Sequence, residues 1–483
     1  MGERKSQSRL TAQFQAFPQT FAPASLRLFL LSFSLPSYTH METHEHNLNV
    51  PLLADKVQQW ASQQPIGFAQ KVEEVEFLSS KPASTASMLS QLEGCVSSHN
   101  LIHFSFFYAG VGILSTPYAL ASGGWLSLTL LFAIAIAAFY SGILIQRCMD
   151  LDPSIRTYPD IGERAFGKKG RLLISVFMYV ELFLVATGFL ILEGDNLHNI
   201  FPSMQFEIGS FLSRKQSLVV IVGLFVLPTV WVDSLSILSY VSASGVLASG
   251  IILISIFWTG AFDGVGFQQK GRPVNWSGIP TAVSLYSFCY CAHPVFPTIY
   301  TSMKKNHQFS CVLVVCFILC TISYAAMAVM GYLMFGDAVE SQVTLNLPVE
   351  KLSSKIAIYT TLLNPICKYA LMVTPIVNTA KQLFPCRSHT MRPLGILVGT
   401  TLVLSNVFVA ICVPFFGYLM ALVGSFLSVT ASIILPCLCY LKISGSYRSI
   451  SYKSVMIWVI ILFGVAEAVF GTYTALGQIL AHL

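Results

Sequence analysis

Apolar runs of about 20 residues dominate the chain from residue 99 onward and are separated only by short polar gaps. A run of this length crosses the hydrocarbon core of a bilayer as one helix. Strands of a membrane barrel are about ten residues long and alternate in polarity, so the pattern excludes a barrel. We predict an all-α integral membrane domain over 99–480 with eleven helices near 99–120, 124–148, 171–193, 216–232, 237–261, 279–300, 309–335, 355–384, 394–412, 414–441 and 454–478.

Residues 1–98 lack this pattern and are rich in Ser, Gln, Glu and Thr, which predicts a disordered cytosolic tail. The apolar run from Leu26 to Leu35 is too short to span a bilayer. It is either a targeting segment or part of a gene-model extension, residues 1–40, upstream of a true start at Met41. We favour the extension, because an ordinary acidic tail opens at Met41.

The composition excludes several classes of function. Hydrophobic residues make up 54% of the chain and charged residues only 10%, whereas soluble proteins carry about 25% charged residues. A soluble fold and a nucleic-acid partner are therefore excluded despite the net charge of +6. We predict no metal and no cofactor, because Cys289, Cys291 and His293 lack zinc-site spacing. No nucleophile–base pair, HExxH motif or glycine-rich phosphate loop is visible, so we expect no enzyme.

The loop charges predict the orientation of the helices. With the N-terminus in the cytosol, fourteen Lys and Arg of the loops lie on the cytosolic side and six on the opposite side. This is the bias that the positive-inside rule requires. Eleven spans then place the C-terminus across the membrane. The sequon Asn275-Trp276-Ser277, a candidate glycosylation site at Asn275, falls on that far side.

Helix-breaking residues interrupt two runs. The first contains Gly110, Gly112 and Pro117, and the sixth contains Pro294 and Pro297. Isolated breakers usually mean only a kink, but two breaks five runs apart match a five-plus-five inverted repeat with the eleventh run added. Half-helix ends at such breaks attract the carboxylate and the ammonium of a zwitterionic amino acid. The predicted substrate-binding residues are Gly110, Val111, Gly112, Ile113, Leu114, Ser115, Cys289, Tyr290, Cys291, Ala292 and His293.

Ionisable side chains in membrane helices are costly and are functional candidates by default. Glu181 in the third run fits proton handling or structural pairing equally well. His293 could contact substrate or titrate, or it could be a satisfied structural histidine. Glu193 and Asp195 fit a capped, hydrated helix end at least as well as a functional role. Glu467, in the eleventh run, fits a packing or oligomer contact better than a functional role.

The eighth run carries a polar group of residues. Asn364 and Lys368 are four residues apart, so they lie on one face of a helix. Pro365 removes a backbone donor and frees the carbonyl of Thr361 on the same side. We predict that Glu181, Thr361, Asn364 and Lys368 act in coupling or as scaffold.

Several motifs resemble a known family. Gly110–Tyr118 followed by Gly123–Leu126 resembles the first-helix motif of the amino acid/auxin permeases. Leu192–Leu197, with Phe201-Pro202 after it, and Asn364–Tyr369 resemble the plant vacuolar amino acid transporter 1-like branch. The resemblance covers about residues 95–480. It implies a LeuT/APC-like inverted-repeat fold with broken helices 1 and 6, and exchange or symport of amino acids with protons.

The sequence thus predicts a secondary transporter of neutral amino acids in the vacuolar membrane, driven by protons and working by alternating access. Antiport into the lumen and the vacuolar location are implied by the resemblance alone; the plasma membrane or another endomembrane is the alternative. The predicted partners are neutral amino acids, protons and the lipid bilayer. Two other functions stay open: an amino-acid sensor with a transporter-like fold, and a carrier of auxin or another organic acid.

The charge bias generates a test of topology. In sealed vesicles, protease should remove the N-terminal tail from the cytosolic face and leave Asn275 protected in the lumen. A new glycosylation sequon in the 156–169 loop of the full-length protein should stay unmodified. Glycosylation at that loop would overturn the orientation.

Overall fold

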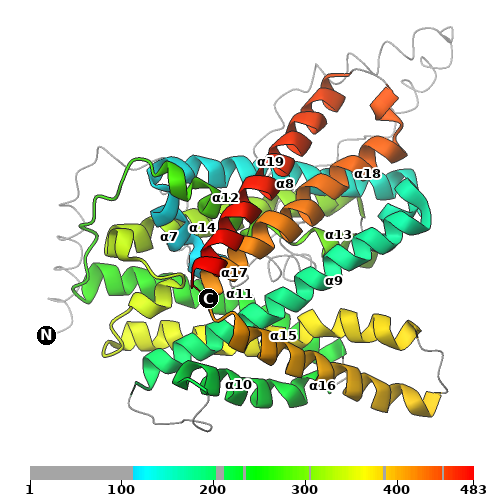
Figure 1. Ribbon diagram of the computed structural model, residues 1–483. Helices are drawn as coiled ribbons and strands as arrows, with labels where there is room; N and C mark the ends of the chain where they lie inside the picture. Colours follow the sequence, from blue (N-terminus) through cyan, green and yellow to red (C-terminus); the bar gives the residue numbers. More distant parts are fainter. Residues whose placement is uncertain are drawn as a thin grey trace, which may run out of the picture. The chain divides into compact units, whose positions relative to one another are not determined.

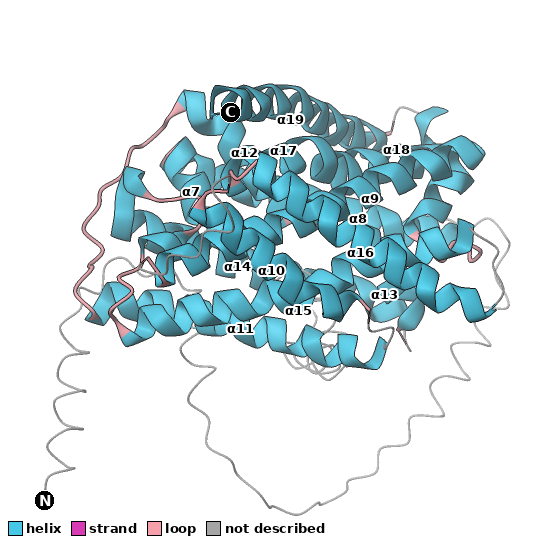
Figure 2. Ribbon diagram, turned by 60° about the horizontal axis from the view of Figure 1, so that its bottom comes forward, coloured by secondary structure: helices cyan, strands magenta, loops and turns pink. Residues whose placement is uncertain are grey.

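The computed structural model describes residues 112–202, 212–231, 235–303, 306–383, 388–448 and 451–482. Every regular element within these ranges is a helix (Figures 1 and 2). The predicted tail at 1–98 and the first-run residues before Gly112 lie outside the described residues.

Helical elements occur at all eleven predicted positions in the described part of the chain, which confirms an all-α protein with many spans. Seven are long and apolar enough to cross a membrane: α8, α9, α14, α15, α16, α17–α18 and α19. Their bounds and those of the shorter helices are α7 Gly112–Gly123, α8 Trp125–Leu151, α9 Tyr158–Ile200, α10 Arg214–Val230, α11 Leu235–Phe262, α12 Ile279–Cys289, α13 Phe296–Ser302, α14 Phe309–Phe335, α15 Leu352–Leu383, α16 Ser388–Cys412, α17 Phe416–Leu422, α18 Leu435–Ile443 and α19 Tyr452–His482.

The sixth span is broken as predicted. Helix α12 ends at Cys289, and a 3₁₀ turn at His293–Val295 leads into α13 at Phe296. Pro294 and Pro297 lack the backbone N–H that a continuous helix would need, but both are tolerated at the start of a new one. The matching break predicted at Gly110 and Val111 in the first span falls outside the described residues.

Helix α9 is longer than the predicted third run. It begins at Tyr158, where the carboxylate of Asp160 accepts a hydrogen bond of 2.8 Å from the N–H of Thr157. Gly167 interrupts it with a φ of 69°, a left-handed conformation that glycine adopts at little cost. The helix then continues to Ile200, past the end expected from hydropathy.

The tenth span contains two π-helical segments, Val423–Ser428 and Thr430–Ile434, between α17 and α18. Two of its carbonyls also accept hydrogen bonds from other spans. The oxygen of Ala431 accepts one from the hydroxyl of Tyr158. The oxygen of Ser432 accepts one of 2.6 Å from Ser141 Oγ. A π-helical bulge thus joins the tenth span to α8 and α9.

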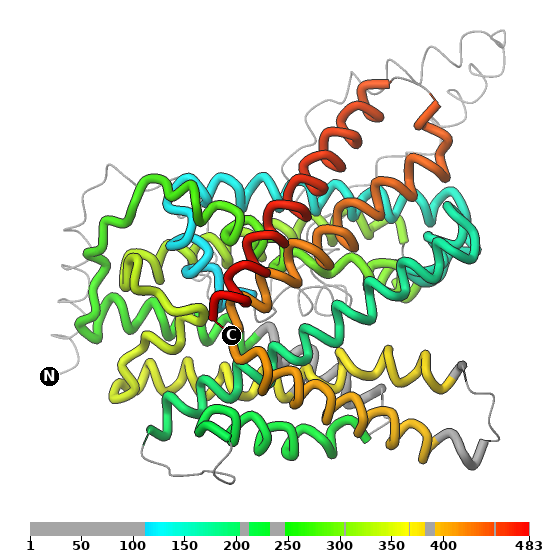
Figure 3. The backbone as a smooth tube through the Cα atoms, in the orientation of Figure 1, coloured from blue at the N-terminus to red at the C-terminus, as the bar shows by residue number. Residues whose placement is uncertain are grey.

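Two groups of helices can be distinguished, one around the broken sixth span and one around α9. Helix α12 packs against α7, α8, α19 and the π-helical part of the tenth span. Helix α9 packs against α10, α15 and α16, which lie side by side in Figures 1 and 3. The π-helical segments also contact α9, so the tenth span lies between the broken helix and α9.

Gly424 permits the close contact between the tenth span and α12. A Cβ at this position would lie 1.9 Å from the backbone oxygen of Ser284. We expect Gly424→Ala to destabilise the fold by about 1–3 kcal/mol, the usual cost of overpacking, and to lower the unfolding midpoint in detergent. Gly477→Ala on α19 is the matched control, because no described atom lies within 4 Å of its Cβ position. Equal midpoints for the two variants would contradict the prediction.

Candidate functional site

The break in the sixth span lies against the start of α7. The thiol of Cys289 donates to the backbone oxygen of Gly112 at 3.4 Å. A Cβ on Gly112 would lie 2.9 Å from the Cys289 sulfur and 3.2 Å from its Cα atom. The structure therefore brings the first and sixth spans together where both predicted sets of site residues lie. In this conformation Cys289 fills the space beside Gly112.

Helix α14 supports the end of α12. The hydroxyl of Tyr324 donates to the backbone oxygen of Cys289 at 3.3 Å. The hydroxyls of Tyr290 and Thr321 are 2.8 Å apart, and the ring of Tyr290 stacks on that of Phe317 with 5.8 Å between centroids. A carbonyl left at the end of the half-helix is thus satisfied by a side chain, as a water-free environment requires.

The α7 residues of the predicted site are buried. Ile113 and Leu114 belong to the apolar core. The hydroxyl of Ser115 donates to the oxygen of Gly112 at 3.0 Å. This bond leaves the carbonyl of Gly112 with two side-chain donors, Ser115 and Cys289. The residues before Gly112, including the predicted Gly110 and Val111, lie outside the described ranges.

His293 is fully buried and links the break to α8. Its Nε2 atom lies 2.8 Å from the oxygen of Ala138 and 2.8 Å from Ser141 Oγ. Because a carbonyl oxygen only accepts, Nε2 carries the hydrogen in this arrangement. The other ring nitrogen, Nδ1, has no hydrogen-bond partner among the described residues. Ser141 in turn donates to Ser432, so one histidine connects three spans.

Glu181 faces the tenth span. Its side chain is buried, and Ser428 Oγ in the π-helical segment donates to it at 2.6 Å. Tyr179, two residues earlier, points to the other side of α9, since two residues turn a helix by about 200°. The hydroxyl of Tyr179 lies 2.5 Å from Thr379 Oγ1 on α15. The side chain of Glu181 therefore points away from α15.

Thr361, Asn364 and Lys368 are all buried on α15. Lys368 and Thr379 are eleven residues apart, about three turns, so they share the face of α15 that meets α9. The Oγ1 atom of Thr361 and the Oδ1 atom of Asn364 have no hydrogen-bond partner in the described part of the chain. The structure thus buries the three predicted α15 residues within two turns of one helix that packs against α9.

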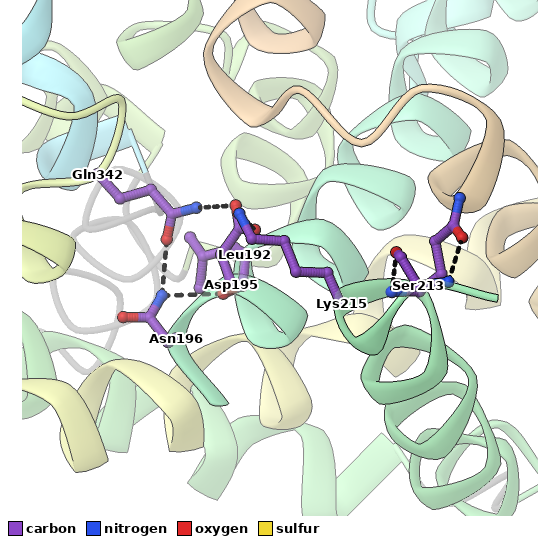
Figure 4. A network of polar contacts seen from close by, with 7 residues as sticks. Leu192, Asp195, Asn196, Ser213, Lys215 and Gln342 are labelled. Carbon is purple, nitrogen blue, oxygen red and sulfur yellow. Dashed lines mark hydrogen bonds and ion pairs between the residues drawn. The ribbon is translucent and has the colours of Figure 1, made fainter. Parts of the chain in front are cut away.

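A polar network at the far end of α9 contains residues that sequence reasoning missed (Figure 4). Asn196 Nδ2 donates to Gln342 Oε1 at 2.6 Å, and Gln342 Nε2 donates to Asp195 at 3.1 Å. Lys215 on α10 forms an ion pair with Asp195 at 3.1 Å. Asp195 and Asn196 lie within the Leu192–Leu197 motif, but no pattern marks Gln342 as a buried bridge.

The sequon lies near the start of α12. Asn275 is half-buried, and its Nδ2 atom donates to the oxygen of Ser122 at 2.9 Å. Ser277 Oγ donates to Asn275 Oδ1 at 2.8 Å. The nitrogen that a glycan would occupy is therefore engaged with the chain in this conformation.

The described residues hold no group of three or more His, Cys, Asp or Glu side chains arranged to bind a metal ion. Cys289 and Cys291 are free thiols. The break carries backbone carbonyls, hydroxyls, two thiols and one imidazole.

The role of His293 as a brace can be measured. We expect His293→Ala to lower the free energy of unfolding by about 1–3 kcal/mol, because it removes the hydrogen bonds to Ala138 and Ser141 and leaves a cavity in place of the buried imidazole. His293→Gln should retain most of the stability, since its amide N–H can reach the same carbonyl. Thermal unfolding of the purified variants in detergent decides this. An alanine variant as stable as wild type would contradict it.

Comparison with known proteins gives concordant matches. The family model described as transmembrane amino acid transporter protein matches residues 99–476. The Arabidopsis thaliana amino acid transporter AVT1I is 59% identical over 376 residues, which is 78% of this chain and 93% of that protein. Amino acid transporter AVT1J of the same plant is 57% identical over 373 residues, 77% of this chain and 88% of that protein. The crystal structure of MhsT in complex with L-phenylalanine aligns with a TM-score of 0.47 and 14% identity over 77% of this chain and 98% of that one.

Proposed function

This chain belongs to the transmembrane amino acid transporter family, whose members are transporters and not enzymes, and we propose that it carries neutral amino acids across the vacuolar membrane in exchange for protons. The observation that carries the proposal is the break at Tyr290–Ala292, which lies against Gly112. A break inside a membrane helix leaves backbone N–H and C=O groups without helical partners, and these groups can bind a small zwitterion. Alternating access then requires the first and sixth spans to separate and close around it.

The broken helix offers both polarities that an amino acid needs. The carbonyl end of α12 at Cys289 carries partial negative charge, which suits an ammonium. If the first span is broken at Gly110 and Val111 as predicted from sequence, the helix that follows would present a partial positive charge at its N-terminal end, which suits a carboxylate. Ile113 and Leu114 are apolar, and Ala292 is small. A charged substrate side chain would need a counter-ion, and the eleven proposed binding residues include no Asp, Glu, Lys or Arg.

The proposed coupling and scaffold residues lie around this centre. Glu181 contacts the tenth span, which packs against α12. Thr361, Asn364 and Lys368 are buried on α15, which packs against α9. We place the ammonium of Lys368 against first-span carbonyls, where it would take the place of a bound cation and make transport independent of sodium.

The membrane and the direction rest on sequence. The fourteen-to-six charge bias supports a cytosolic N-terminus and a lumenal C-terminus. The vacuolar location and import into the lumen are supported by the resemblance of the Leu192–Leu197 and Asn364–Tyr369 motifs. Each pH unit across the membrane supplies about 1.4 kcal/mol per proton, so a lumen two units more acidic supports about hundredfold accumulation in one-for-one exchange.

Uptake into proteoliposomes tests the proposal. The full-length protein is reconstituted, an acidic interior is imposed, and uptake is scanned over the twenty amino acids with sodium or with choline outside. We expect accumulation of neutral amino acids that depends on the pH gradient and is the same in both salts. Binding without net flux would favour the sensor, and accumulation of auxin or another organic acid instead would overturn the substrate class.

A further inference from the structure

Glu193 on α9 is a buried carboxyl group to which no atom in the described part of the chain donates a hydrogen bond. Its side chain is 2% exposed, and neither carboxylate oxygen has a partner among the described residues. Its neighbour Asp195 differs, because Lys215 and Gln342 both donate to it. A carboxylate in such a place is stable only when it takes up a proton or gains a cationic partner.

The register between α9 and α15 shows what faces Glu193. Tyr179 of α9 contacts Thr379 of α15. Eight residues further along α9, Thr187 contacts Asn406, which also bonds Tyr369, ten residues back along α15. From the first contact to the second, the residue numbers rise along α9 and fall along α15, so the two helices are antiparallel.

The same register can be extended to Glu193. Fourteen residues forward from Tyr179 is Glu193, and fourteen back from Thr379 is Pro365. Fourteen residues are close to four helical turns, so each returns to nearly the same face. Glu193 therefore lies opposite the segment 361–368 of α15.

That segment carries the polar residues already described. Thr361 Oγ1 and Asn364 Oδ1 are buried without hydrogen-bond partners among the described residues, and Lys368 is 2% exposed. The register therefore places the buried carboxyl of Glu193 across from the stretch of α15 that carries these polar residues.

Other charged and titratable groups lie near this end of α9. Lys215 is held by Asp195, and the carboxyl of Glu181 is three turns away and bonded to Ser428. The described elements packed against the far half of α9 carry Arg214 and Lys215 on α10, Glu340 in the loop after α14, Lys368 and Tyr369 on α15 and Tyr418 on α17, and α9 itself carries Asp195 and His198.

We propose that Glu193 is the carboxyl group whose protonation couples proton movement to transport. The inference rests on the proposed proton-driven transport. The carboxylate takes a proton from the acidic lumen to become a neutral carboxylic acid and releases the same proton to the cytosol.

Replacing the carboxyl with an amide separates coupling from substrate exchange. Wild type, Glu193→Gln and Glu467→Gln are reconstituted with the neutral amino acid that wild type accumulates most in the scan. Glu467 is the matched control, a second buried carboxyl without a partner among the described residues, on α19. Two measurements are made on each: accumulation under a gradient of two pH units, and exchange of labelled for unlabelled substrate at equal pH.

We expect about hundredfold accumulation by wild type and Glu467→Gln, and accumulation near onefold by Glu193→Gln with exchange retained. Accumulation by Glu193→Gln equal to wild type, or the same loss in Glu467→Gln, overturns the assignment. If Glu193→Gln does not fold, Glu193→Asp is measured in its place. A pH dependence of accumulation equal to that of wild type would then overturn the proposal. A wild-type protein that does not accumulate substrate contradicts the proposed function and not this inference.

Discussion

A membrane helix that stops inside the bilayer leaves backbone groups that only the protein can satisfy. In this chain the stop is at Cys289, and the surrounding spans supply what the missing turn would have supplied. Tyr324 donates to the carbonyl of Cys289, and His293 fixes the resumed helix to the carbonyl of Ala138. Hydrogen bonds at this one break thus hold α8 and α14 against the sixth span.

The same requirement explains the polar residues of the tenth span. Its π-helical segments meet Tyr158, Ser141 and the carboxyl of Glu181 through hydrogen bonds to Ala431, Ser432 and Ser428. Buried polar groups in the described core differ in how they are satisfied. Around the break, the carbonyls of Cys289 and Ala138 accept hydrogen bonds that hold the fold together. On α9 and α15, Glu193 and Asn364 carry oxygens without hydrogen-bond partners among the described residues.

The sequence predicts what depends on local properties. The length of the apolar runs predicts the helices. Pro294 and Pro297 predict the break in the sixth span, because each proline acts on the backbone of its own segment. The extension of α9 to Tyr158–Ile200 was missed, since the turn at Gly167 and the cap at Asp160 lie in polar sequence. Glu193 reads from sequence equally well as a hydrated helix end. Its burial depends on how α9 packs against distant helices, which no local pattern records.

Gly112 shows why packing and binding are hard to separate in such a protein. The thiol of Cys289 now occupies the space beside Gly112, so a larger residue there would disturb the contact between the first and sixth spans. A substrate carboxylate at the end of α7 would need the same space. If the proposed function holds, Cys289 must withdraw whenever substrate enters. The contact between Cys289 and Gly112 then closes the two spans in one conformation, and its opening forms the site in another. Glycine suits both conformations, because it leaves space for the thiol in one and for the substrate in the other.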